Sequence, residues 1–98
     1  MGNIAEVVDV NRLFRVRNIG FASKILEVLE KRISKRSIVA GIGVGLVKDY
    51  GAAQRLYVNR GYVPNGKGAY YKKNNLGYFE EVIADDDLVL YLTKNLTV

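Results

Sequence analysis

The chain has no cysteine, no histidine and no tryptophan, and its 98 residues include a single proline and a single methionine. Without cysteine there can be no disulfide, no thiolate metal site and no cysteine nucleophile. Without histidine the chain lacks the commonest general base and metal ligand, so we expect no catalytic zinc and no other metal cofactor. We see no signal peptide and no apolar run long enough to cross a bilayer, and we therefore expect a cytoplasmic protein without a membrane partner.

The composition is that of a folded protein. Hydrophobic residues make up 49% of the chain and seven are tyrosines, which favours a globular domain over disorder. The length predicts a single domain over residues 1–98. Fifteen basic and ten acidic residues give a net charge of +5, with the basic residues crowded into the first third and many acidic residues late. A basic end suits a phosphate-rich ligand, although each lysine can equally belong to a solvated helix face.

The spacing of apolar residues predicts two helices. The residues that recur at helical spacing in the first are Ala22, Ile25, Leu26, Leu29 and Ile33. They predict a helix from about Gly20 to Lys35. A shorter helix is predicted over Asp49–Asn59, with Asp49 as its N-cap and Gly61 ending it as a C-cap glycine.

Strands are predicted on both sides of these helices, over Ile4–Val10, Ser37–Leu46, Tyr78–Ile83 and Leu88–Leu92. A turn is predicted over residues 62–66, and a loop or weak strand follows at Tyr70 and Tyr71. In the second strand the even positions are bulky, and the odd ones include Gly41, Gly43 and Gly45. Such a row indicates either close approach of a ligand or another backbone, or a helix packed tightly over the glycines.

The predicted order is β-α-β-α-β-β, an α/β (α+β) fold with a mixed sheet. A helix between the first two strands suggests a right-handed parallel crossover, and the late strands would add antiparallel. The most informative segment, Arg17-Asn18-Ile19-Gly20-Phe21-Ala22, connects the first strand to the first helix. A small-residue loop at a helix start lets backbone N–H groups close on a phosphate, where the helix dipole also favours negative charge.

This loop, the long helix, the next strand and a second helix with Ala53-x-x-Leu56-Tyr57 and Gly61-Tyr62 together resemble the GNAT superfamily of acyl-CoA N-acyltransferases. The resemblance runs from about Ala5 to Leu92. Residues 41–46 and 50–57 are similar to an uncharacterised bacterial branch of that superfamily. The resemblance implies a GNAT-like fold, acetyl-CoA or coenzyme A as cosubstrate, and a primary amine as acceptor.

The resemblance also implies roles for the loop and the strand before it. The backbone amides of Asn18, Ile19, Gly20, Phe21 and Ala22 would hold the coenzyme A pyrophosphate. Arg17 would stand at the mouth of this loop. Val10 and Arg12, at the end of the first strand, would flank the pantetheine arm.

Two catalytic roles follow in the same way. Tyr57 matches the family's tyrosine, a general acid toward the leaving thiolate, and a phenol is neutral at pH 7 as that role requires. The alternative is a core tyrosine on an apolar helix face. Glu6 lies where some members carry the general base, and burial would raise its pKa. The alternative is a solvent-facing glutamate, and Asp9 on the opposite face is a rival base.

Two departures from the family pattern matter. Tyr50 stands where the family often has an asparagine, so that cofactor contact does not carry over. The chain also starts almost on the loop-bearing strand, so the resemblance implies a truncated domain without the half that normally forms much of the acceptor wall, or else a cloned fragment. That would leave the strand over Ile4–Val10 as an exposed edge, and we expect a homodimer in which two copies cover each other.

Three functions are therefore weighed. The first is an acetyl-CoA-dependent N-acyltransferase with Tyr57 as general acid. The second is a non-catalytic coenzyme A-binding module that keeps the phosphate loop. The third is nucleic-acid binding through the basic cluster and the tyrosines, but most tyrosines fall in the second half, away from that cluster, which makes nucleic acid an unlikely partner.

Overall fold

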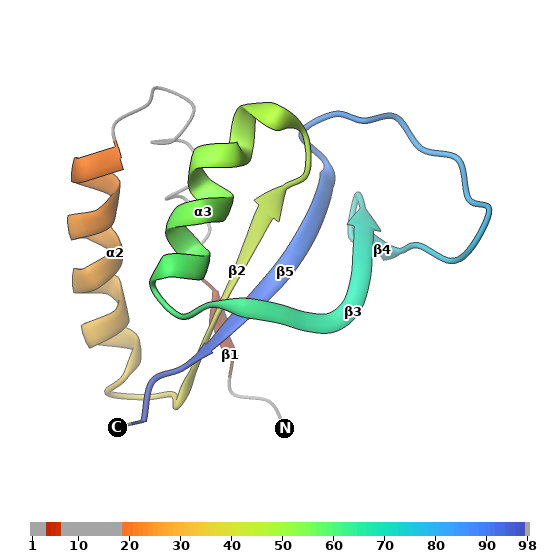
Figure 1. Ribbon diagram of the computed structural model, residues 1–98. Coiled ribbons are helices and arrows are strands. Elements are labelled where there is room, and N and C mark those ends of the chain that lie inside the picture. The colour runs from red at the N-terminus through yellow and green to blue at the C-terminus, as the bar shows by residue number, and fades with distance from the viewer. Residues whose placement is uncertain (1–3, 7–18, 98) are drawn as a thin grey trace.

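The computed structural model of the chain describes residues 4–6 and 19–97, and for residues 4–6, 19 and 21 it describes the backbone alone (Figure 1). The elements are β1 (Ile4–Glu6), α2 (Ile19–Ile33), β2 (Val39–Gly45), the 3-10 helix η1 (Lys48–Tyr50), α3 (Gly51–Asn59), β3 (Val63–Tyr71), β4 (Asn74–Asn75) and β5 (Leu88–Asn95). The chain thus forms a small α+β domain. Its late part contributes three strands where the sequence predicts two.

The described strands form one mixed sheet in the order β1-β2-β5-β3-β4. β1 and β2 are parallel, with Ala5 opposite Ala40, and α2 connects them. The other pairs are antiparallel, and Ile42 of β2 lies opposite Leu92 of β5. The predicted parallel pair and antiparallel late strands are therefore confirmed. Both helices begin at the end of the sheet toward which β2 points (Figure 1).

α2 and α3 cover one face of the sheet, and the core lies between them and that face. The buried apolar residues are Ala22, Leu26, Ile33, Ala40, Ile42, Val44, Tyr50, Ala53, Tyr57, Tyr62 and Leu92. Leu26 and Ile42 have no exposed surface, and burial of each side chain contributes about 1.5–3 kcal/mol. The helical spacing that predicts α2 therefore marks the stripe that meets the bulky, even-numbered face of β2.

Tyrosine rings cover two glycines of β2, Gly43 and Gly45, at the row where the sequence left open a ligand, another backbone or a packed helix. A Cβ on Gly43 would lie 2.9 Å from Cε1 of Tyr91, which comes from the neighbouring strand β5. A Cβ on Gly45 would overlap the ring of Tyr50 in η1. Tyr70 of β3 then packs edge-on against Tyr91, with ring centroids 5.1 Å apart. The small residues make room for side chains that approach from other elements.

The end of α3 is as predicted and its start is not. Asp49 lies inside η1, and the N-cap of α3 is Tyr50, which makes no side-chain capping hydrogen bond. The chain turns into α3 through the 3-10 helix, so the aspartate is one residue too early to cap it. At the other end Gly61 has φ +98° and donates its N–H to the Val58 carbonyl. A left-handed glycine of this kind ends many helices.

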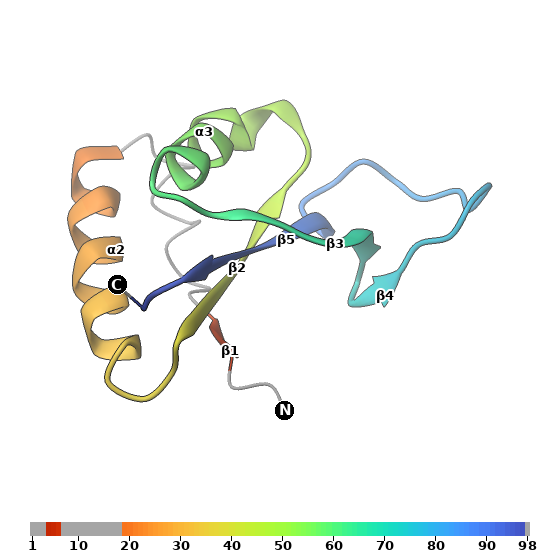
Figure 2. The same cartoon turned by 60° about the horizontal axis from the view of Figure 1, so that its bottom comes forward.

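The segment after α3 also differs from its prediction. The predicted turn over residues 62–66 is wrong, because residues 63–66 belong to β3. The pairing of β3 with β5 shifts register between Pro64 and Ala69. A tight turn at Lys72 and Lys73, both with positive φ, joins β3 to β4. The predicted strand over Tyr78–Ile83 is wrong, because residues 76–87 form a loop that projects from the sheet (Figure 2). β5 follows it and confirms the last predicted strand.

Candidate functional site

The first turn of α2 is the part of the predicted phosphate loop that the structure describes. α2 begins at Ile19, and its first turn contains no acidic residue. Gly20 is exposed, and no atom lies within 4 Å of the place where its Cβ would be. The first N–H groups of a helix have no partner within the helix and carry its positive dipole end. Among the described residues, the turn is exposed at Gly20 and holds no carboxylate that would compete with an anion.

The structure describes only some of the other predicted site residues. Ala22 is fully buried and belongs to the core, so its side chain serves packing. Val10, Arg12, Arg17 and Asn18, together with the rival base Asp9, lie outside the described residues. Glu6 lies in β1 and pairs in register with Gly41 of β2, which places its backbone beside the glycine row. Of Phe21 the structure gives the helical backbone.

Tyr57 lies on the face of α3 that packs against the sheet, and its exposed fraction is 0%. Its ring centroid lies 5.9 Å from that of Tyr62. Burial raises the pKa of Tyr57 well above its ordinary value of 10.0, so the phenol keeps its proton at neutral pH. A general acid must also come within hydrogen-bond reach of the group that it protonates. The protonated phenol of Tyr57 suits a general acid. Its complete burial is that of a core residue.

The first turn of α2 and Tyr57 lie at different positions along the helix axes. Both helices begin at the same end of the sheet (Figure 1). Tyr57 comes two residues before the last residue of α3, Asn59, and so lies toward the opposite end. Tyr57 therefore lies about 9 Å along the helix axis from the start of α3.

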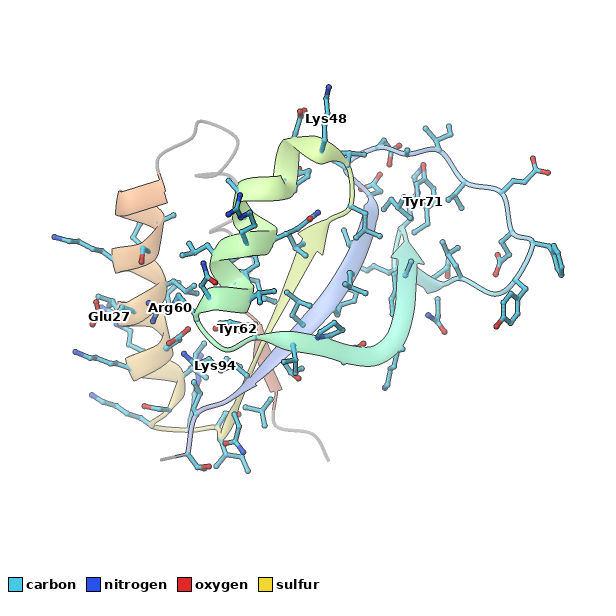
Figure 3. The ribbon with its side chains drawn as sticks, in the orientation of Figure 1. Glu27, Lys48, Arg60, Tyr62, Tyr71 and Lys94 are labelled. Atoms are coloured by element: carbon cyan, nitrogen blue, oxygen red, sulfur yellow. The ribbon has the colours of Figure 1, made fainter. Side chains whose placement is uncertain are left out.

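A buried polar cluster around Glu30 was not predicted. Glu30 of α2 is 8% exposed and lies in the gap between the two helices and β5. Its carboxylate accepts hydrogen bonds from Nη2 of Arg60 at 2.8 Å, from the Tyr62 hydroxyl at 2.9 Å and from Nζ of Lys94 at 2.9 Å (Figure 3). The Lys94 ammonium also lies 5.7 Å from the Tyr62 ring centroid. These contacts join α2 to the end of α3 and to β5.

The electrostatics of this cluster suit a structural tie. Burial disfavours the charged form of Glu30, but hydrogen bonds from Arg60, Lys94 and Tyr62 outweigh it and hold the pKa of Glu30 below its ordinary value. Burial, with the adjacent carboxylate, raises the pKa of Tyr62. No buried side-chain nitrogen or oxygen atom among the described residues lacks a hydrogen-bond partner. A sequence signal existed, because Glu30 stands four residues after Leu26 within the apolar stripe of α2.

Two of the hollows on the described surface have a lining that bears on function. The larger, about 560 Å³, is lined by Val47, Lys48, Asp49 and residues 84–87, and so by four aspartates and one lysine. The Tyr71 hydroxyl donates to Oδ2 of Asp85, a residue of this lining, at 3.0 Å. The smaller, about 280 Å³, is lined by Gln54, Arg55, Val58 and Asn59 of α3. Tyr57 contributes to the lining of neither.

Within residues 4–6 and 19–97, no group of three or more acidic, histidine or cysteine side chains is arranged to hold a metal ion. No helix in the same residues has both the length and the apolar character needed to span a bilayer. Comparison of the chain with known protein families, with curated proteins and with solved structures finds no match.

Proposed function

We propose that the chain binds acyl-coenzyme A and serves as the acyl-donor half of a GNAT-like N-acyltransferase. The observation that carries the proposal is the parallel β1-α2-β2 unit with an open helix start free of carboxylates. In sheets of this kind, ligands bind outside the carboxyl ends of the strands, where helix N-termini face them. The amides of residues 18–22 would receive the pyrophosphate, with Arg17 beside it.

The offset of Tyr57 along α3 from the end of the sheet where both helices begin (Figure 1) fits this ligand. In coenzyme A the pantetheine arm separates the pyrophosphate from the thiol. With the pyrophosphate on α2, the arm would pass Val10 and Arg12 and bring the thioester toward Tyr57. The layout supports one extended ligand that uses both places.

The proposed reaction is direct transfer to a primary amine. The amine nitrogen forms a bond to the thioester carbonyl carbon and gives its proton to Glu6, or to Asp9. The resulting oxyanion would be stabilised by a backbone N–H near Val10. When the carbon–sulfur bond breaks, the leaving thiolate takes the proton of the Tyr57 hydroxyl, so the products are an amide and free coenzyme A. The base then releases the amine's proton to solvent, and the tyrosinate takes one up, which restores both groups.

A second candidate, a coenzyme A-binding module without catalysis, is favoured by the burial of Tyr57. A phenol with no exposed surface cannot reach a leaving sulfur unless the ligand enters the core beside it. Both candidates share the phosphate site, and they differ in turnover alone. The predicted homodimer stays a prediction, and it agrees with the position of β1 at one edge of the described sheet.

The test of the shared site is calorimetric titration with coenzyme A and acetyl-CoA. Gly20→Asp places a carboxylate in the first turn of α2 and should weaken binding at least about tenfold, since like charge next to a phosphate opposes the dipole. Gly51→Asp is the matched control, because Gly51 opens α3 and its Cβ position is equally free. Acidic residues at a helix start favour the helix, so neither variant should unfold.

Two results would contradict the proposal. If Gly20→Asp binds coenzyme A as tightly as the natural chain, the phosphate does not bind at the start of α2. An equal loss in Gly51→Asp would indicate a general effect of added negative charge. Turnover with a panel of amines then decides between the transferase and the binding module.

A further inference from the structure

The loop over residues 76–87 exposes large apolar side chains without a described partner element. It is twelve residues long and contains no strand or helix. Tyr78 is 95% exposed, Phe79 is 100% exposed, and Ile83 is 69% exposed. Connections this long without secondary structure are uncommon in compact domains, and many of them are functional. Exposed aromatic residues grouped at one tip indicate an interaction surface.

The tip of this loop has a defined conformation. Phe79 has φ +65°, which is rare for a bulky residue, and Glu80 accepts a hydrogen bond from the backbone N–H of Gly77. The rings of Tyr78 and Phe79 lie 6.2 Å apart and present one aromatic patch. A positive φ at a bulky residue costs free energy, and the hydrogen bond between Gly77 and Glu80 helps to hold the chain in it. The tip is therefore already shaped for contact.

The charge of the loop limits which partner it can take. Residues 76–87 carry five carboxylates, Glu80, Glu81, Asp85, Asp86 and Asp87, and no cation. Such a surface repels nucleic acid and anionic membranes, and it attracts a basic surface that also offers apolar contact.

The outer side of α2 is a surface of that kind on this same chain. The exposed cations of α2 and the turn after it are Lys24, Lys31, Arg32, Lys35 and Arg36, with Glu27 as the one exposed carboxylate among them. Val28 is 50% exposed and shares the helix side of Lys24 and Lys31, opposite the buried stripe. Figure 3 shows nitrogen-tipped side chains that project from α2 away from the sheet. We call residues 24, 28, 31, 32, 35 and 36 the cationic face.

The loop cannot reach the cationic face of its own molecule. α2 lies at one side of the domain and the loop projects from the other, in both views (Figures 1 and 2). The domain extends 40 Å along its longest axis. Only another molecule can bring the two surfaces together, and a second copy carries both. Two reciprocal contacts, loop to α2 and α2 to loop, would close a two-fold dimer.

We propose that the 76–87 loop docks on the cationic face of α2 in a second copy of this chain. Tyr78 and Phe79 pack around Val28, and Glu80 and Glu81 face Lys24 and Lys31. The contact combines an apolar centre with a charged surround, as specific interfaces do. It involves neither Tyr57 nor the first turn of α2, so it holds whether or not the chain binds coenzyme A.

The test is the mass of the full chain by analytical ultracentrifugation, without coenzyme A, from about 1 to 100 μM, where weak interfaces assemble. A mass of two 11.0 kDa chains is expected, with weaker association at ~500 mM than at ~50 mM salt. Phe79→Asn removes the ring but keeps a residue that tolerates positive φ, and it should weaken association at least about tenfold. Val63→Ser, at an exposed apolar residue of β3, is its control and should have no effect.

Exchanging the two charges tests whether Lys31 of one copy faces Glu81 of the other. Lys31→Glu and Glu81→Lys should each weaken association about tenfold, and the double variant should recover to within about threefold of the natural chain. Lys67→Glu, an exposed cation of β3, is the matched control.

Three results would overturn the proposal. The chain could stay monomeric at every concentration, or form a dimer that Phe79→Asn and Lys31→Glu leave intact, which would point to strand pairing at β1. In the third, a monomer binds a single-stranded oligonucleotide through Lys31, so that the cationic face takes a polyanion instead.

Discussion

Replacement of Glu30 by glutamine tests the main polar connection of the fold. Glu30→Gln keeps the shape of the side chain but removes the charge that faces Arg60 and Lys94. Both cations have side chains that are 22% exposed, and the glutamate side chain is 10% exposed. Loss of one partner of a buried ion pair costs about 3–5 kcal/mol. Since the cations keep part of their hydration and the amide oxygen still accepts one bond, we expect about 3 kcal/mol.

The assay is urea and thermal denaturation at pH 7. For a domain of this size about 3 kcal/mol corresponds to a fall in Tm of roughly 12–24 °C. Glu27→Gln is the matched control, because Glu27 lies three residues earlier on the exposed side of the same helix (Figure 3). It should change stability by less than about 0.5 kcal/mol.

Glu30→Gln should also change how the stability of the fold depends on pH. The pKa of Glu30 is lower in the folded chain than its ordinary value of 4.5, so the unfolded chain takes up this proton first as the pH falls. The stability contributed by the ionised glutamate is therefore present above about pH 4.5 and is lost as the pH falls through the folded pKa. Glu30→Gln should lose less stability on acidification than the natural chain. Equal stability of the two glutamine variants, or equal acid dependence of Glu30→Gln and the natural chain, would refute the reasoning.

Two further predictions concern tyrosine packing and chemistry. Tyr57→Phe should lower acyl transfer at least about 100-fold in steady-state kinetics, while coenzyme A binding measured by calorimetry stays within about twofold. If transfer and binding fall together, the hydroxyl supports the fold and does not act as the general acid. Gly45→Ala should destabilise the fold by about 1–3 kcal/mol in urea denaturation, because the new methyl group overlaps the buried ring of Tyr50. Gly51→Ala, whose methyl group meets open space in a helix, should stabilise the fold by about 0.5–1 kcal/mol. If Gly45→Ala leaves the free energy of unfolding unchanged, the Tyr50 ring can move aside to make room for the methyl group.

Local patterns predicted the elements whose structure depends on near neighbours in sequence. The apolar spacing of α2 needs only the helical repeat, and Gly61 ends α3 because a left-handed residue is required directly after it. β5 is a run of apolar and β-branched residues, and it was predicted for that reason. Asp49 failed as a cap because the 3-10 turn before α3 moved the N-cap by one residue, to Tyr50, which no local rule fixes.

The candidate site was predictable in part. The open helix start at Gly20 follows from the loop sequence, since a glycine and the lack of acidic residues are visible there. The sequence left open whether Tyr57 is a general acid or a core tyrosine. Its burial follows from the packing of α3 on the sheet. The partners of Glu30 lie 30, 32 and 64 residues away along the chain, so no spacing rule reveals them.

By itself the sequence determined the two helices, the last strand and the excess of positive charge, because each depends on residue type and short-range periodicity. It also predicted the parallel first pair, because a helix between two strands favours a parallel crossover. Only the tertiary structure decided that tyrosine rings cover the glycine row, that Glu30 joins α2 to α3 and β5, and that residues 78–83 stay out of the sheet. A strand needs a partner at hydrogen-bonding distance, and a buried carboxylate needs donors around it. Both are set by segments that lie far apart along the chain.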